Sequence, residues 1–100
     1  MIEEFENTED NGIHFVKFGA EWCQPCRALE PSLNKFEEEC ISKVKVHRLD
    51  VDVAFDMASK YNIRNIPTIL IFKNGEPIDR LHGVQSLQNL KTKLEYVESN

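Results

Sequence analysis

The segment Ile13–Phe18 is apolar at four of its six positions, and it constrains the fold of this chain more than any other feature. A strand with one wet face alternates apolar and polar side chains, whereas a strand covered on both faces is apolar throughout, as is typical of parallel sheets. A turn over residues 19–24 and a helical pattern follow. Because parallel strands need a crossover, this order predicts a right-handed βαβ unit. One face of the helix carries Leu29, Leu33, Phe36 and Cys40.

The second half of the chain has the pattern of a hairpin followed by a helix. The Asn-Gly pair within Lys73–Glu76 is typical of a tight two-residue turn, and Pro77 after it favours an edge strand. Ser86 is a suitable N-cap for the last helix. After the first helix we predict strand Val44–Val51, helix Asp52–Tyr61 stopped by Asn62, strand Thr68–Phe72, strand Pro77–His82 and a helix with Leu87, Leu90, Leu94 and Val97 inward.

The predicted fold class is α/β, with helices on both faces of a central mixed sheet. The sheet has four strands, or five if the N-terminal segment adds one. Residues 1–11 leave two interpretations open, a short edge strand over Ile2–Phe5 or one or two helical turns over Glu3–Asp10. A full strand and a full helix do not both fit before Ile13. A chain of 100 residues suits one domain, which we expect to span residues 1–100.

Charge and hydropathy narrow the class of protein. The net charge is −5 and the lysines and arginines are scattered, which argues against a nucleic-acid binder. The longest apolar run, Ile69–Phe72, is too short to cross a bilayer. The acidic start of the chain lacks the basic and then apolar pattern of a secretory signal. We therefore expect a cytoplasmic monomer that binds neither nucleic acid nor membrane.

The pair Cys23 and Cys26 is the strongest candidate for chemistry, because it falls where a buried strand gives way to a helix. Unpaired N–H groups and the positive end of the helix dipole favour a thiolate at Cys23, so its pKa should fall below that of a free thiol. Cys26 lies nearly one helical turn further on, and the two sulfurs can close a disulfide. We expect Cys26 to be the more buried, suited to resolving a mixed disulfide.

Two structural explanations compete with redox chemistry at this pair. Zinc needs four ligands, and the remaining candidates show no paired spacing: they are Cys40, His14, His47 and His82. A plain pair of core cysteines is the other alternative. Trp22 before the pair and the polar Gln24 within it favour exposure instead. An odd count of three cysteines fits poorly with a disulfide-stapled secreted protein and favours a reducing compartment.

These motifs together resemble the thioredoxin family. Phe18–Cys26 (FGAEWCQPC) is similar to the active-site stretch of thioredoxins, Ile63–Thr68 (IRNIPT) to their second signature, and Phe72–Glu76 (FKNGE) to their hairpin. Gly83 resembles the glycine that follows their last strand. The order and spacing match without an obvious insertion from Ile13 to Gly83. The resemblance implies a three-layer thioredoxin-like fold whose N-terminal strand or helix is shortened.

The resemblance also implies a function and a set of site residues. The family reduces protein disulfides with the cysteine pair alone, so no further cofactor is expected, and a thioredoxin reductase regenerates the dithiol. Pro67 would follow a cis peptide bond and face the disulfide, and the backbone of Ile66 would pair with an extended client strand. The apolar docking surface around Cys23 would consist of Trp22, Ile66, Gly83 and Val84. Ordinary core packing is the alternative for Ile66 and Val84.

Two positions depart from the family pattern. Gln24 stands where the commonest thioredoxins have glycine, although Pro25 is retained and favours the reducing end of the family. Lys17 stands where thioredoxins usually carry a buried aspartate beneath the resolving cysteine, so a proton-relay role does not carry over. Because burying an unpaired ammonium is costly, Lys17 must reach water along its apolar stem, find an acidic partner or lose its proton. A charged Lys17 near Cys26 would lower the pKa of that thiol, and a neutral one could accept its proton.

Two other functions stay open at this stage. The chain could serve as a binding or scaffold subunit with no obligatory redox role, although the intact cysteine pair argues against this. An oxidant or isomerase of the same fold is the other rival, which a measured reduction potential would separate. We expect Cys40, on the apolar helix face, to fill the core with no redox role.

Overall fold

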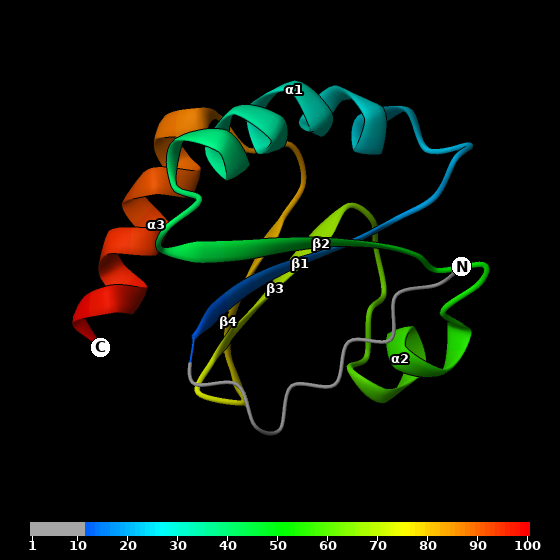
Figure 1. Ribbon diagram of the computed structural model, residues 1–100. Coiled ribbons are helices and arrows are strands. Elements are labelled where there is room, and N and C mark those ends of the chain that lie inside the picture. The colour runs from blue at the N-terminus through cyan, green and yellow to red at the C-terminus, as the bar shows by residue number, and fades with distance from the viewer. Residues whose placement is uncertain (1–11) are drawn as a thin grey trace.

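The computed structural model describes residues 12–100, so both interpretations of the N-terminal segment lie outside the described residues. In this range the chain forms four strands and three helices (Figure 1). The elements in chain order are β1 Ile13–Gly19, α1 Gln24–Glu39, β2 Val44–Asp50, α2 Phe55–Lys60, β3 Thr68–Lys73, β4 Glu76–His82 and α3 Leu87–Ser99. This order is the one predicted from the sequence.

The four described strands form one mixed sheet in the order β2-β1-β3-β4. β1 pairs in parallel with β2, and α1 makes the crossover between them, as the sequence predicts. β3 runs antiparallel to both β1 and β4. Every residue of β1 after Ile13 is buried, and so are the first five residues of β3, whereas β4 is an exposed edge. The segment Ile13–Phe18, from which a strand covered on both faces was predicted, is therefore part of an interior strand.

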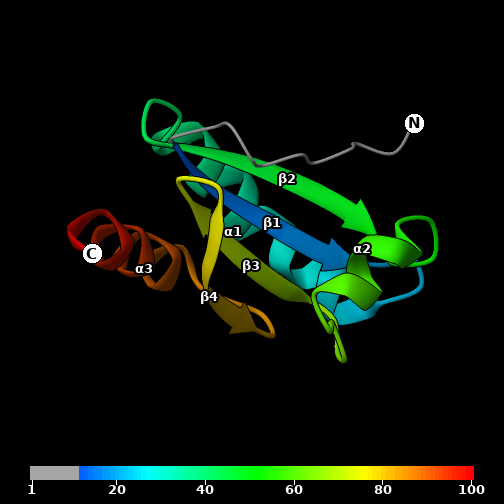
Figure 2. The same ribbon diagram turned by 90° about the horizontal axis from the view of Figure 1, so that it is seen from below.

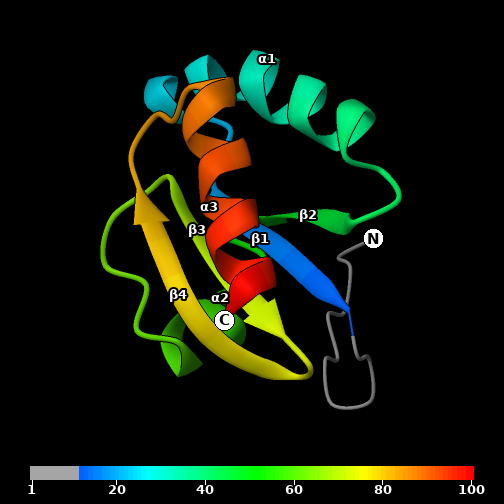
Figure 3. The same cartoon turned by 90° about the vertical axis from the view of Figure 1, so that its left-hand side faces the viewer.

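Alternate residues of the central strands face two separate cores. Phe15 and Ile71 lie on one face of the sheet and pack under α1 and α3, while Val16 and Phe72 lie on the other face with α2. Figures 2 and 3 show α1 and α3 together on one side of the sheet and α2 alone on the opposite side. The three-layer arrangement with helices on both faces is confirmed.

Local signals place the turns correctly. Asn74 and Gly75 both have positive φ values, 54° and 84°, as a tight Asn-Gly hairpin requires. Asn62 also adopts a positive φ, 58°, where the helix was expected to stop. The side chain of Ser86 accepts a hydrogen bond from the backbone N–H of Asn89 at 3.0 Å and caps α3.

The second helix is shorter than predicted. The prediction was Asp52–Tyr61, and α2 spans Phe55–Lys60. Asp50 closes a separate turn before the helix: its carbonyl accepts from the N–H of Ala54 at 2.7 Å, and its carboxylate accepts from the N–H of Asp52 at 2.8 Å. A carboxylate that bonds to the backbone two residues on competes with helix formation, so the helix begins later.

Candidate active site

Cys23 caps the N-terminus of α1, as the sequence predicts. Its backbone is extended, and its sulfur accepts a hydrogen bond from the backbone N–H of Cys26 at 3.2 Å. Pro25 occupies the first helical turn, where its missing N–H leaves no acceptor unpaired. A disulfide joins Cys23 to Cys26. The helix N-terminus therefore offers N–H groups and a favourable dipole to a thiolate on Cys23.

The surroundings of Cys23 are partly open. Trp22, Gln24 and Pro25 are exposed, and the Trp22 side chain is 67% exposed. The indole N–H of Trp22 donates to the carboxylate of Asp52 at 2.9 Å, which fixes the ring beside the turn that follows β2. An exposed tryptophan held in one orientation next to a reactive sulfur is a suitable contact for a macromolecule.

The loop before β3 faces Cys23 from the opposite side. The Ile66–Pro67 peptide bond is cis, as the resemblance implied, and the Ile66 carbonyl oxygen lies 4.0 Å from the Cys23 sulfur. The N–H of Gly83 donates to the Pro67 carbonyl at 2.9 Å, with Gly83 at a φ of 81°. Val84 is 50% exposed. Ile66 is half-buried against the core that α2 covers.

Lys17 lies beneath the other cysteine. Alternation along β1 puts it on the same face as Phe15, which α1 covers, and the residue is only 9% exposed. Its ammonium donates to the Cys26 carbonyl at 3.4 Å and forms an ion pair with Glu30. The interpretation that this ammonium reaches open water is wrong, because it ends on a carboxylate. A buried ammonium needs such a partner, since burying it alone is costly.

Glu30 and Arg48 complete a charge array that the sequence analysis missed. The second oxygen of Glu30 accepts from Arg48 Nε at 3.0 Å, and Arg48 also pairs with Glu37 at 3.0 Å. Burial opposes ionisation of Glu30, but the hydrogen bonds and charges of Lys17 and Arg48 outweigh it and hold its pKa below the usual value of 4.5. Two weak signals existed: Glu30 follows Cys26 by one helical turn, and Arg48 is the register partner of Lys17.

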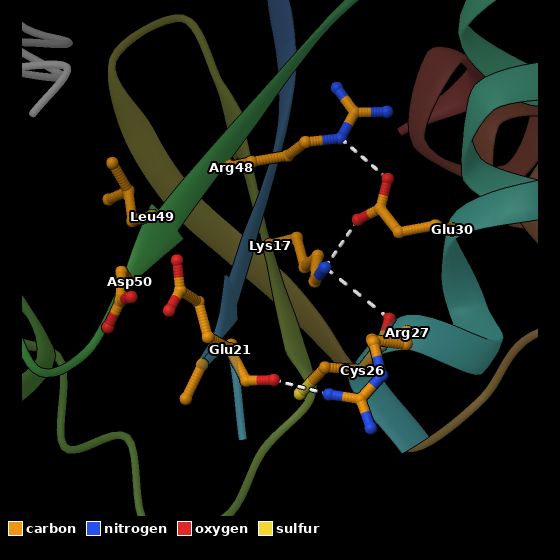
Figure 4. A pocket seen from close by; sticks show the side chains of 10 residues that line it. Lys17, Glu21, Cys26, Arg27, Glu30, Arg48, Leu49 and Asp50 are labelled. Atoms are coloured by element: carbon orange, nitrogen blue, oxygen red, sulfur yellow. Dashed lines mark hydrogen bonds and ion pairs between the residues drawn. The ribbon is translucent and has the colours of Figure 1, made fainter. Parts of the chain in front are cut away.

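A pocket of about 340 Å³ opens over this array and reaches Cys26 (Figure 4). Gly19 forms part of its wall at a point of close approach. A Cβ atom on Gly19 would lie 2.9 Å from Lys17 Cε and 3.1 Å from the Cys26 sulfur. The pocket is lined by Lys17, Gly19, Ala20, Glu21, Cys26, Arg27, Glu30, Arg48, Leu49 and Asp50.

The remaining cysteine and the histidines lie elsewhere. Cys40 is free, half-buried at the C-terminus of α1, and packs against the core under α1 and α3, in line with its predicted role as a core filler. His14 and His47 contact each other at 2.9 Å on neighbouring strands, which the sequence analysis did not predict. Within residues 12–100, no cluster of three or more His, Cys, Asp or Glu side chains is arranged to hold a metal ion. None of the helices in that range is long and apolar enough to span a bilayer.

Comparisons with known proteins agree with this geometry. A sequence model of the thioredoxin family matches residues 2–96. Thioredoxins from Staphylococcus aureus, such as those of strains Mu50 and MW2, are 35% identical over 92 residues, which is 92% of this chain and 88% of theirs. The X-ray structure of Fasciola hepatica thioredoxin has a TM-score of 0.79 at 29% identity, covering 86% of this chain and 81% of that one. This chain therefore belongs to the thioredoxin family and is a dithiol–disulfide oxidoreductase of the thioredoxin type.

Proposed function

We propose that Cys23 is the attacking thiolate of this protein-disulfide reductase and that Cys26 is the resolving thiol. The difference between their surroundings carries the proposal. Cys23 is 4% exposed and caps a helix beside the exposed Trp22 and the Ile66 carbonyl, whereas Cys26 is 1% exposed and its carbonyl accepts a hydrogen bond from Lys17. A client disulfide approaches the first sulfur more easily, and the helix terminus favours its ionised form.

The reaction then proceeds in two exchanges. The Cys23 thiolate attacks one sulfur of the client disulfide, which forms a mixed disulfide and releases the other client sulfur as a thiolate that takes a proton from water. Cys26 loses its proton to water and attacks the Cys23 sulfur. This closes the Cys23–Cys26 disulfide and releases the second client sulfur, which is also protonated. Two electrons have passed from the protein to the client.

Docking of the client uses the surface around Cys23. An extended client segment pairs with the backbone of Ile66, in a short form of strand addition. Trp22, Gly83 and Val84 contact its side chains, and Trp22 and Val84 are well exposed. Pro67 holds the loop in place from a buried position, and Gln24 lies exposed between the cysteines.

The partners follow from the cycle. Members of the thioredoxin family act on disulfide-containing clients and are regenerated by a reductase, and we assign both kinds of partner to this chain. The oxidised form must be reduced again after each turnover, which suits the reducing conditions of the cytoplasm. We therefore place the protein there, acting as a monomer and without a bound cofactor beyond its own disulfide.

Trapping of the mixed disulfide tests the assignment. In a Cys40→Ala background, Cys26→Ser should capture a disulfide client covalently, because attack still occurs and release does not. Cys23→Ser should capture nothing and should lose insulin reduction with dithiothreitol. The captured complex is measured on non-reducing gels and by mass. Capture by Cys23→Ser and not by Cys26→Ser would reverse the two roles, and capture by neither would remove the proposed mechanism.

A further inference from the structure

Charges from three elements meet beneath the resolving cysteine. Lys17 comes from the interior strand β1, Glu30 from α1 and Arg48 from the edge strand β2. Each adjacent pair is in contact: Lys17 with Glu30, and Glu30 with Arg48 at 3.0 Å. Figure 4 shows the Lys17 nitrogen between the Glu30 carboxylate and the Cys26 carbonyl. The array is therefore anchored at one end to the cysteine and at the other to the protein surface.

The Lys17 side chain has little freedom to leave this place. Its Cε atom and the Cys26 sulfur both approach the open side of Gly19, at 2.9 and 3.1 Å from the position of a Cβ atom there. The Lys17 side chain is 11% exposed, and both of its hydrogen-bond acceptors belong to α1. The ammonium is thus held near the Cys26 sulfur by packing and by charge together.

We propose that Lys17, positioned by Glu30 and Arg48, supplies a fixed positive charge that stabilises the thiolate of Cys26 and so sets the pH range in which the client is released. This proposal rests on the proposed function, because it assigns the resolving step to Cys26. Lys17 and its two partners are positioning residues. An ammonium already carries its proton and cannot accept another, so the proton of Cys26 goes to water in the pocket.

The sign of the effect depends on which charge lies nearest to Cys26. The charged groups facing the pocket are Lys17 from β1, Glu21 before α1, Arg27 and Glu30 from α1, and Arg48 and Asp50 from β2. Cations and carboxylates are equal in number, so the pocket as a whole is balanced. Arg27 is turned toward the Glu21 carbonyl, and Arg48 toward Glu30 and Glu37. Lys17 is the cation whose ammonium donates to the backbone of Cys26 itself, so we assign to Lys17 the positive charge that acts on this cysteine.

The experiment is a single-turnover measurement of client release across a pH series. Uncharged variants Lys17→Met and Lys17→Gln should move the midpoint of the release rate upward by about one pH unit. A thiolate of higher pKa is less abundant but more nucleophilic, with a Brønsted slope of about 0.4–0.5. The variants should therefore release client about threefold more slowly at neutral pH and about threefold faster at alkaline pH. Lys17→Arg, which keeps the charge, should restore most of the original profile.

Slower release at neutral pH and faster release at alkaline pH mean that the rate–pH profiles of variant and parent cross. A charge effect gives such a crossing, whereas a loss of structure does not. Lys93→Met is the matched control, because Lys93 forms a similar half-buried pair with Asp79 at 2.6 Å and does not line the pocket. Its profile should equal that of the parent. If Lys17→Met does not fold, Lys17→Gln still tests the proposed charge effect, because its amide keeps a hydrogen-bond donor in place. Parallel profiles with an unchanged midpoint in a folded uncharged variant would overturn the proposal.

A double-mutant cycle tests whether Glu30 acts through Lys17. Glu30→Ala should change the midpoint of release in the parent, and should change it much less in the Lys17→Met background. Independent, additive shifts would mean that Glu30 does not position Lys17. The rate of client capture by Cys26→Ser is measured alongside. Normal capture with no crossing refutes this proposal alone, whereas absent capture refutes the proposed function.

Discussion

The two sides of the disulfide are built in different ways. We call Trp22, Ile66, Pro67, Gly83 and Val84 the client side, and Lys17, Gly19, Glu30 and Arg48 the pocket side. The client side consists of the exposed side chains of Trp22 and Val84 and a loop, with Ile66 half-buried and Pro67 buried, that presents backbone groups. The pocket side consists of half-buried charges around a close-packed glycine.

Under the proposed function, this difference places client docking on one side of the disulfide and control of the Cys26 thiol on the other. In that function the client side contacts the client proteins, so shape and backbone hydrogen bonds suit it better than specific charges. The pocket side lies beneath Cys26, and partly buried charges act on it more strongly than they would in open water. Changes on the client side should therefore affect capture, and changes on the pocket side should affect stability and release.

The largest effect is expected where the pocket side is most tightly packed. Gly19→Ala puts a methyl group against Lys17 and the Cys26 sulfur, and overpacking of this kind costs about 1–3 kcal/mol of unfolding free energy. Urea unfolding of the oxidised protein measures it. Gly83→Ala on the client side meets no atom within 4 Å, and its cost comes from the positive φ alone. Gly83→Asn should therefore recover stability, while Gly19→Asn should not.

Trp22→Ala should weaken docking of a protein client and leave the residues of the pocket side in place. Truncating a contact residue of this kind reduces the rate of attack on a protein client by about tenfold, or about 1.4 kcal/mol. Attack on a small aromatic disulfide should fall much less, because such a substrate needs little docking surface. Stopped-flow capture rates for both substrates provide the comparison. An equal loss for both would mean that Trp22 supports Cys23 itself and not the client.

Acid should weaken the pocket side. The pKa of Glu30 in the folded protein is below its ordinary value of 4.5, because Lys17 and Arg48 outweigh the effect of burial. Its ionised form therefore contributes stability above pH 4.5, and that contribution is lost as the pH falls through the lowered folded value. Glu30→Gln should flatten this part of the urea-midpoint profile. The effect is small, since the Glu30 side chain is 30% exposed and partly screened.

Asp79 provides the reference for that measurement. Burial raises the pKa of Asp79, but the hydrogen bonds from Lys93 and the Arg80 backbone lower it by more, so the net pKa is below the ordinary value of 3.8. Ionised Asp79 therefore also stabilises the protein above pH 3.8. Acid sensitivity that remains in Glu30→Gln is expected from this pair. A profile identical to the parent's would show that Glu30 contributes nothing to acid stability.

The smallest effect is expected for Cys40→Ala, which touches neither side. Cys40 is half-buried at the far end of α1, so its truncation should cost no more than about 1 kcal/mol. Insulin reduction and the release profile should match the parent. Loss of turnover in the folded variant would give Cys40 a redox role that its position does not explain.

Prediction from the sequence succeeded best where the signal is local. The strands around Ile13–Phe18 and Thr68–Phe72, the Asn-Gly turn and the Ser86 cap were located within a residue or two. The start of α2 was placed three residues early, because Asp50 bonds to the turn before it. The residues of the client side were proposed through the family resemblance, which rests on contiguous motifs, and their role in docking stays a prediction. The pocket side was found only in part, since Lys17 was identified and its partners were not.

Which segments are buried and where a thiolate is favoured could be predicted from the sequence, because both depend on neighbours along the chain. Periodicity sets the faces of strands and helices, and a helix N-terminus attracts negative charge wherever it lies. The partners of Lys17, in contrast, depend on how the chain folds. Its partner Glu30 is 13 residues away along the chain, and Arg48 is a further 18. A charge at the end of a flexible four-carbon stem can point in many directions, and only the packing of α1 over β1 and β2 selects one.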